Sequence, residues 1–238
     1  MIRRDKRAHN EFRPIRFTPN FTEYAEGSVL IEAGRTRVLC NVSIEDSVPA
    51  WREASGGGWL TAEYAMLPRA THQRLSRRRG SESARSQEIR RLIGRALRAS
   101  VNLDLLGSRT LIVDCDVIQA DGGTRTTAVT GAYVALALAL GRLIETDGLP
   151  AEVLTTPVAA VSVGVVEGDL LLDLCYEEDA AAAVDLNIVM TGSGKFVEIQ
   201  GTAETEPFER DTLTALIDLA GQGIERLLDA QEQALRQL

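Results

Sequence analysis

Histidine, lysine and cysteine are all scarce in this chain of 238 residues. The only histidines are His9 and His72, which disfavours a histidine-rich metal site and weakens any Ser–His or Cys–His catalytic mechanism. The three cysteines are far apart and form no C-x-x-C pair, so neither a disulfide framework nor a structural zinc site is expected. Because lysine occurs only at Lys6 and Lys195, arginine supplies nearly all the positive charge, and its planar guanidinium suits phosphate.

Long apolar segments are also few. The first seven residues are basic, but no apolar run follows them, so no secretory signal is expected. The most apolar stretch, residues 128–141, is short and interrupted, which argues against a membrane span. We therefore expect a cytoplasmic protein without a membrane partner.

Charge is distributed unevenly along the chain. The net charge is −8, yet residues 69–98 contain ten arginines and two acids and carry +8. A basic block inside an acidic chain is the electrostatic footprint of a polyanion site, although a solvated helix face is the alternative. Few aromatic residues lie near this block, which favours contacts to a nucleic-acid backbone over stacking on bases.

Hydrophobic periodicity predicts strands followed by a helix in each half of the chain. The expected strands are residues 29–31, 37–42, 59–66, 110–118, 158–166, 170–175, 184–190 and 196–201. Helices are expected around residues 89–97, from about 124 to 144, and from about 208 onward, while residues 71–84 and 177–183 are expected to be loops. The fold class is α+β with mixed sheets, packed helices and two pseudo-repeated halves, roughly residues 1–150 and 151–238, in one domain without a linker.

A glycine turn before the helix expected at residue 124 could hold an anion. The run from Gln119 to Thr126 reads QADGGTRT, which places two glycines at a strand-to-helix junction. Backbone N–H groups and the positive end of the helix dipole would face a phosphate there, with Arg125 as a charged donor. The alternative is an ordinary Asp-Gly-Gly turn with a threonine N-cap.

An acidic cluster in the second half could bind magnesium through oxygen ligands. Its members are Asp173, Glu177, Glu178, Asp179 and Asp185. A solvated acidic turn is the alternative for most of them. Asp185 differs, because it begins an apolar strand between Val184 and Leu186, where an unpaired carboxylate would be costly.

Seven stretches of the sequence are distinctive when taken together: EGSVLI (26–31), GWLTAEY (58–64), MLPRAT (66–71), residues 88–99, DCDVIQADGGTRT (114–126), YEED (176–179) and MTGSG (190–194). Through these stretches, the chain resembles the ribonuclease PH family along its whole length. The resemblance implies a phosphorolytic 3′ exoribonuclease that trims transfer-RNA precursors and adds nucleotides in reverse. It also implies two βαβ-type halves like the second domain of ribosomal protein S5, and a homohexamer built as a trimer of dimers.

The resemblance further implies roles for individual residues. Its phosphate site falls on Arg85, Gly123, Thr124 and Arg125. Its catalytic, magnesium-linked aspartates fall on Asp179 and Asp185. Its RNA-contacting arginines fall on Arg69, Arg74 and Arg77. The chain departs from the family at residues 84–86, where Ala-Arg-Ser replaces the usual Gly-Arg-Thr, but Glu88 and Ile89 follow Arg85 in register.

Two other functions share some of these features. An inactive relative that only binds RNA would keep the arginines but lose an acid or the glycine turn. A hydrolytic nuclease of another fold would use the acidic cluster alone, release nucleoside monophosphates and need no phosphate. The presence of arginines, turn and acids together favours phosphorolysis, in which inorganic phosphate is the co-substrate.

Overall fold

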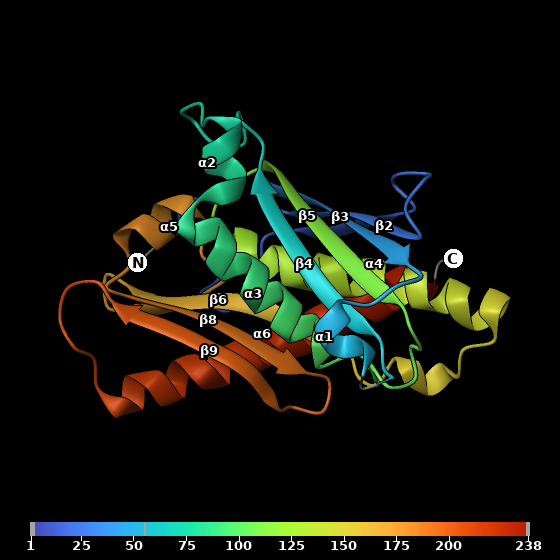
Figure 1. Cartoon of the computed structure of the whole chain (residues 1–238). Coiled ribbons are helices and arrows are strands. Elements are labelled where there is room, and N and C mark those ends of the chain that lie inside the picture. Colours follow the sequence, from blue (N-terminus) through green and yellow to red (C-terminus); the bar gives the residue numbers. More distant parts are fainter. Residues whose placement is uncertain (1–2, 55, 237–238) are drawn as a thin grey trace.

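The computed structural model describes residues 3–54 and 56–236, which form alternating layers of sheet and helix (Figure 1). A five-stranded sheet packs on the helices α3 (Ala84–Arg98) and α4 (Thr124–Asp147). A four-stranded sheet lies on the other side of these helices, and α6 (Arg210–Arg236) covers its far face. The predicted α+β class is therefore confirmed.

The first sheet is mixed and contains the strands of the first half. Its strands, in spatial order, are β1 (Ile15–Pro19), β2 (Gly27–Ala33), β3 (Thr36–Glu45), β5 (Thr110–Gln119) and β4 (Trp59–Met66). Strands β4 and β5 are parallel and are joined through α3, whereas the other pairs are antiparallel. Alternate residues such as Val38, Cys40 and Val42 are fully buried against the helices, as period-two patterning requires.

Helix α4 is the central element of the core. Most of its residues are buried, because it contacts β2 and β3 on one side and β6 on the other. It is longer than the apolar stretch at residues 128–141 suggests, and by length and composition alone it could cross a membrane. In the most apolar 18-residue stretch of this helix, 78% of the residues are buried inside the protein. The place of α4 between the two sheets therefore explains its apolar character.

The second sheet consists of antiparallel pairs in the order β7-β6-β8-β9. Its strands are β6 (Val158–Val166), β7 (Asp169–Leu172), β8 (Val184–Thr191) and β9 (Phe196–Ala203). Strand β6 is buried on both faces: Ala160 packs toward α4, while Val161 belongs to the core beneath α6. The two halves therefore share a buried interface.

Both segments expected to be loops contain short helices. Within residues 71–84 lies α2 (Arg77–Glu82), whose first turn is capped by the Ser76 hydroxyl. Within residues 177–183 lies most of α5 (Tyr176–Ala181). Neither helix has an apolar period, so the prediction was wrong where capping and tertiary contacts determine the structure. Strand β1, α1 (Ala50–Glu53) and a 3₁₀ turn (Ala151–Val153) were also not predicted.

Candidate functional site

A cavity of about 630 Å³ lies where the N-termini of α3 and α4 meet the second sheet. It is lined by Arg85, Glu88, Arg125, Asp179, Asp185, Ile199, Gln200, Gly201, Thr202 and Glu204. Four of the predicted site residues, Arg85, Arg125, Asp179 and Asp185, are thus brought together from four different elements. The lining is predominantly polar and charged, which suits a small anion better than an apolar ligand.

The two arginines stand at matching positions on two long helices. Arg85 is the second residue of α3 and is exposed, and Arg125 is the second residue of α4 and is 17% exposed. Nη1 of Arg125 donates to Oε1 of Gln200 at 3.0 Å and lies 3.4 Å from Oε1 of Glu88. Each arginine adds its charge to the positive end of its own helix dipole, so both favour an anion at this place.

The predicted glycine turn forms the start of α4 but does not line the cavity itself. Gly122 and Gly123 both have positive φ, at +77° and +62°, which explains why glycine occupies these positions. The Thr124 side chain is buried and its Oγ1 accepts a hydrogen bond from the Tyr64 hydroxyl at 2.9 Å. Gly123 and Thr124 therefore shape the turn beside the cavity and are not among its lining residues.

Asp179 and Asp185 face the arginines from the second half. Burial, together with the negative charge of Asp179, raises the pKa of Asp185 to about 6, although Arg125 and a hydrogen bond from Asn187 oppose the shift. Loss of hydration inside the cavity also raises the pKa of Asp179, against the positive charges of Arg85 and Arg125. Oδ1 of Asp185 is buried and has no hydrogen-bond partner in the structure. A buried carboxylate oxygen left in this state is suited to a cation.

These residues fit a magnesium ion of the kind that keeps most of its water ligands. In residues 3–54 and 56–236, no three His, Cys, Asp or Glu side chains are grouped closely enough to enclose a metal. Two carboxylates are, however, what magnesium commonly takes from a protein when water and substrate phosphates supply the other ligands. Asp179 and Asp185 are the pair that would hold it.

The remaining acids of the predicted cluster have structural partners. Asp173 binds the guanidinium of Arg13, and Glu178 binds that of Arg3, with N–O distances of 2.6 and 2.7 Å. Glu177 pairs with Arg4 at the surface. Sequence spacing alone could not tell these structural acids from the site residue Asp179, because their partners come from a distant N-terminal segment.

The predicted RNA-contacting arginines lie on the segment that precedes α3. Arg69, Arg74 and Arg77 are exposed, and none of them lines the cavity. Within the described part of the chain, no acidic side chain forms an ion pair with these three, whereas Arg78 pairs with Glu82. The segment therefore presents unpaired positive charge before α3. Figure 1 shows α2, which carries part of this segment, next to the start of α3.

Four polar residues of the cavity were not predicted: Glu88, Gln200, Thr202 and Glu204. Gln200 and Glu88 contact Arg125, and the negative charge of Glu204 raises the pKa values of both aspartates. Glu204 follows the last residue of β9, and nothing in its local sequence marks it. Gln200 has no local signal either, because it reaches the cavity through the pairing of β9 with β8.

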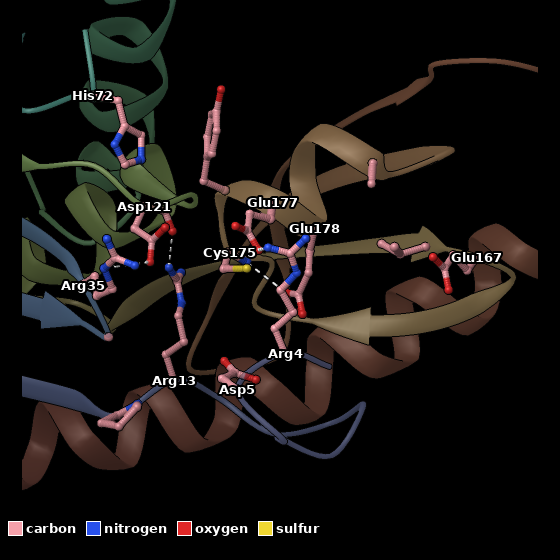
Figure 2. A pocket seen from close by; sticks show the side chains of 15 residues that line it. Arg4, Asp5, Arg13, Arg35, His72, Asp121, Glu167, Cys175, Glu177 and Glu178 are labelled. Carbon is pink, nitrogen blue, oxygen red and sulfur yellow. Dashed lines mark hydrogen bonds and ion pairs between the residues drawn. The ribbon is translucent and has the colours of Figure 1, made fainter. Parts of the chain in front are cut away.

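A larger cavity, of about 740 Å³, lies on the other side of α5 (Figure 2). It contains side chains of both charges, with Arg4 and Arg35 opposed by Asp5, Asp121 and Glu177. Of the predicted acidic cluster, Glu177 and Glu178 line it, but none of the residues that the family resemblance assigns to phosphate, magnesium or RNA does. Its mixed charge gives no preference for a phosphate, so the smaller cavity is the better candidate.

Comparison with known proteins identifies the class of this chain. Residues 11–140 match the model for domain 1 of the 3′ exoribonuclease family, and residues 156–223 match the model for domain 2. The chain belongs to the 3′ exoribonuclease family.

Individual relatives narrow this class to ribonuclease PH. The chain is 54% identical to ribonuclease PH of Bacillus subtilis (strain 168), covering 98% of this chain and 97% of the relative. It is 53% identical to ribonuclease PH of Moorella thermoacetica, covering 99% and 95%. The resemblance inferred from the sequence is confirmed.

Solved structures confirm the fold at much lower identity. Rice Rrp46 has a TM-score of 0.79 at 20% identity, covering 98% of this chain and all of that one. A chain of the Archaeoglobus fulgidus exosome with RNA bound to the active site has a TM-score of 0.80 at 23% identity, covering 96% and 92%.

Proposed function

We propose that the 630 Å³ cavity is the site at which inorganic phosphate attacks the last phosphodiester of an RNA chain. The protein is a phosphate-dependent 3′-to-5′ exoribonuclease that trims RNA ends, with transfer-RNA precursors as substrates. Each cycle releases one nucleoside diphosphate and shortens the RNA by one nucleotide, and the reaction also runs backward as nucleotidyl addition. The observation that carries this proposal is the meeting of two helix-start arginines and two aspartates in one cavity.

Phosphate and the scissile diester are both anions, so the site must overcome their repulsion. Arg85, Arg125 and the positive ends of α3 and α4 would hold the phosphate and offset its charge. Glu88 and Gln200 would keep the Arg125 guanidinium oriented between turnovers. In this type of reaction, positioning and electrostatic stabilisation supply most of the rate enhancement.

Asp179 and Asp185 would hold magnesium on the opposite wall of the cavity. When bound, the ion would supply positive charge to neutralise the negative charge that develops on the diester oxygens. Without it, the two ionised carboxylates would repel the RNA 3′ end, which is also an anion.

The arginines before α3 would guide the RNA toward the cavity. Arg69, Arg74 and Arg77 would contact backbone phosphates of a single strand, without reading bases. We further propose a homohexamer, arranged as a trimer of dimers, in which such segments face a common RNA path. The three cysteines are free thiols, which suits a protein of the reducing cytoplasm.

One assay separates this function from its rivals. RNA with a labelled 3′ end is incubated with magnesium, with and without inorganic phosphate, and the released nucleotide is identified. Phosphorolysis requires phosphate and yields nucleoside diphosphates. Nucleoside monophosphates formed without phosphate would indicate a hydrolytic nuclease, and RNA binding without any released nucleotide would indicate an inactive relative.

Matched variants connect this activity to the cavity. Arg125→Ala removes an arginine of the proposed phosphate site, whereas Arg91→Ala removes an exposed arginine of α3 that does not line the cavity. We expect the first variant to need far more phosphate for the same nucleotide release, and the second to keep the phosphate requirement of the wild type. Equal activity in the two variants would remove Arg125 from the site.

A further inference from the structure

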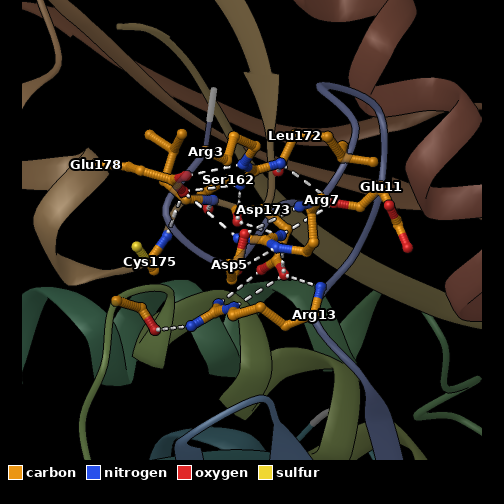
Figure 3. Close-up of polar contacts among 12 residues, drawn as sticks. Arg3, Asp5, Arg7, Glu11, Arg13, Ser162, Leu172, Asp173, Cys175 and Glu178 are labelled. Atoms are coloured by element: carbon orange, nitrogen blue, oxygen red, sulfur yellow. Dashed lines mark hydrogen bonds and ion pairs between the residues drawn. The ribbon is translucent and has the colours of Figure 1, made fainter. Parts of the chain in front are cut away.

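Arg13 is a buried arginine that joins the two halves of the molecule (Figure 3). Its side chain is 4% exposed and forms a fork with Asp173, with Nε 2.9 Å from Oδ2 and Nη2 2.6 Å from Oδ1. The backbone N–H of Arg13 donates to the same Oδ2 at 2.9 Å. Burial alone would lower the pKa of Arg13, but the hydrogen bond and the charge of Asp173 raise it, so the guanidinium stays charged.

The guanidinium of Arg13 also contacts the glycine turn before α4. Nη1 donates to the carbonyl oxygen of Asp121 and lies 3.5 Å from that of Gly122. One arginine thus binds the first half through two carbonyl groups of the turn and the second half through a carboxylate. An uncharged or shorter side chain could not make both sets of contacts.

Thr36 at the start of β3 holds the same turn from the sheet. Its hydroxyl donates to the carbonyl oxygen of Gly122 at 2.7 Å and accepts from the N–H of Asp121 at 2.9 Å. The side chain is completely buried. The Thr36 hydroxyl therefore supplies hydrogen bonds to two peptide groups of the turn, which the bent backbone cannot satisfy within a helix or strand.

The turn packs directly against the backbone that leads into α5. A Cβ atom placed on Gly122 would lie 2.6 Å from the carbonyl oxygen of Leu174 and 2.7 Å from the amide nitrogen of Tyr176. Asp179 lies one turn further along α5. A shift of the turn would therefore change the distance between the helix start that carries Arg125 and the helix that carries Asp179.

We propose that Arg13 and Thr36 are positioning residues, which fix the Gly122–Gly123 turn against residues 173–176 and so align Arg125 with Asp179 and Asp185. This inference rests on the proposed function of the cavity. Neither residue lines the cavity or touches the reacting atoms. Both act through the turn, and their loss should weaken phosphate binding without removing any phosphate ligand.

The chain offers a matched control for Thr36. Thr130 on α4 is equally buried, and its hydroxyl also bridges a peptide group, donating to the carbonyl oxygen of Ala160 at 3.2 Å and accepting from its N–H at 3.1 Å. Thr36→Val and Thr130→Val therefore remove the same pair of hydrogen bonds at two places. Of these two threonines, only Thr36 contacts the glycine turn before α4.

The test measures the KM for phosphate, kcat and the melting temperature of the full-length variants, with Thr36→Ser as the conservative rescue. Misplacing a binding group by about 1 Å can cost up to roughly a hundredfold. We expect Thr36→Val and Arg13→Lys to raise the KM for phosphate on the order of tenfold. Thr130→Val should lower the melting temperature comparably but leave this KM within about twofold of wild type, as should Thr36→Ser.

The outcomes distinguish the inference from the function on which it rests. If Arg125→Ala raises the KM for phosphate but Thr36→Val and Arg13→Lys behave like Thr130→Val, the turn residues are merely structural and the inference is wrong. If Arg125→Ala leaves this KM unchanged, the proposed phosphate site itself is wrong. Should Arg13→Lys fail to fold, Thr36→Val decides the question alone.

Discussion

Asp185→Asn should make this protein more stable while it abolishes activity. The ionised carboxylate of Asp185 is partly buried beside Asp179, and one of its oxygens has no hydrogen-bond partner. Its pKa rises from 3.8 to about 6, which corresponds to about 3 kcal/mol of unfavourable energy for the charged form in the folded state. An asparagine of the same shape carries no charge and avoids most of this cost.

The expected gain is somewhat smaller than the full electrostatic cost, because the amide leaves one polar group unpaired. We expect a net increase of about 2 kcal/mol in the free energy of unfolding at pH 8. For a chain of this length, that corresponds to a rise of roughly 4–8 °C in melting temperature. EDTA must be present, since bound magnesium would stabilise the wild-type carboxylate.

The pH dependence of the gain tests its cause. Between pH 4 and pH 6, the folded wild-type protein binds a proton at Asp185 that the unfolded chain does not bind. Acidification therefore stabilises the wild type through this group, and the advantage of D185N must shrink as the pH falls from about 6 toward 4. Thermal unfolding at fixed protein concentration, at pH 8, 6.5 and 5, measures the difference.

Asp173→Asn is the contrasting control. Asp173 is also a buried aspartate of the second half, but it is paired with Arg13, so its replacement leaves a buried guanidinium uncompensated. Breaking such a pair typically costs about 3–5 kcal/mol. Two results would refute the reasoning that burial destabilises the ionised Asp185 carboxylate. One is a D185N variant less stable than wild type at pH 8, and the other is a stability gain that is the same at pH 8 and pH 5.

Three further predictions concern the cavity and the basic segment. Arg125→Ala and Arg85→Ala should each raise the KM for phosphate roughly ten- to hundredfold, the usual effect of losing a charged hydrogen bond; initial rates over a phosphate series measure this, and unchanged values would exclude the residue. Arg69→Ala and Arg74→Ala should weaken RNA binding equally for all sequences and reduce the salt slope by about one each in fluorescence titrations, whereas altered sequence preference would contradict backbone contacts. Gln200→Glu should raise the KM for phosphate more than Gln200→Ala, because a carboxylate 3.0 Å from Arg125 competes with phosphate; the reverse order would contradict this contact.

The regular elements of the core were largely predictable from sequence. The strand from Trp59 to Met66 has the predicted bounds, and α4 begins at Thr124 as expected, because burial on alternate positions or all around a helix leaves a strong pattern. Strand β1 was missed because it is a short edge strand that ends in Pro19. Helix α2 has no apolar stripe, and Gly80 packs on the Met66 carbonyl instead.

The candidate site was predictable where its chemistry follows a local motif. The glycine turn and Arg125 share one run of sequence, and Asp185 is marked by its apolar neighbours. Gln200 and Glu204 approach the cavity only through the pairing of β9 with β8, a non-local feature. Asp179 lines the cavity and its neighbour Glu178 does not. This difference likewise depends on a non-local contact, because Glu178 binds Arg3, which lies 175 positions away in the chain.

The buried contacts of Arg3 and Arg13 also constrain the order of folding during synthesis. Arg13 binds Asp173 across 160 positions, so the first thirteen residues emerge from the ribosome long before their partners exist. At about 5–20 residues per second, the wait is on the order of ten to thirty seconds. The first sheet and α4 can form in that interval, but Arg3 and Arg13 remain without their buried acidic partners until residues 173–178 are made. A nascent chain therefore cannot join its phosphate turn to the second half through Arg13 until residue 173 is in place, which delays catalysis until synthesis is nearly complete.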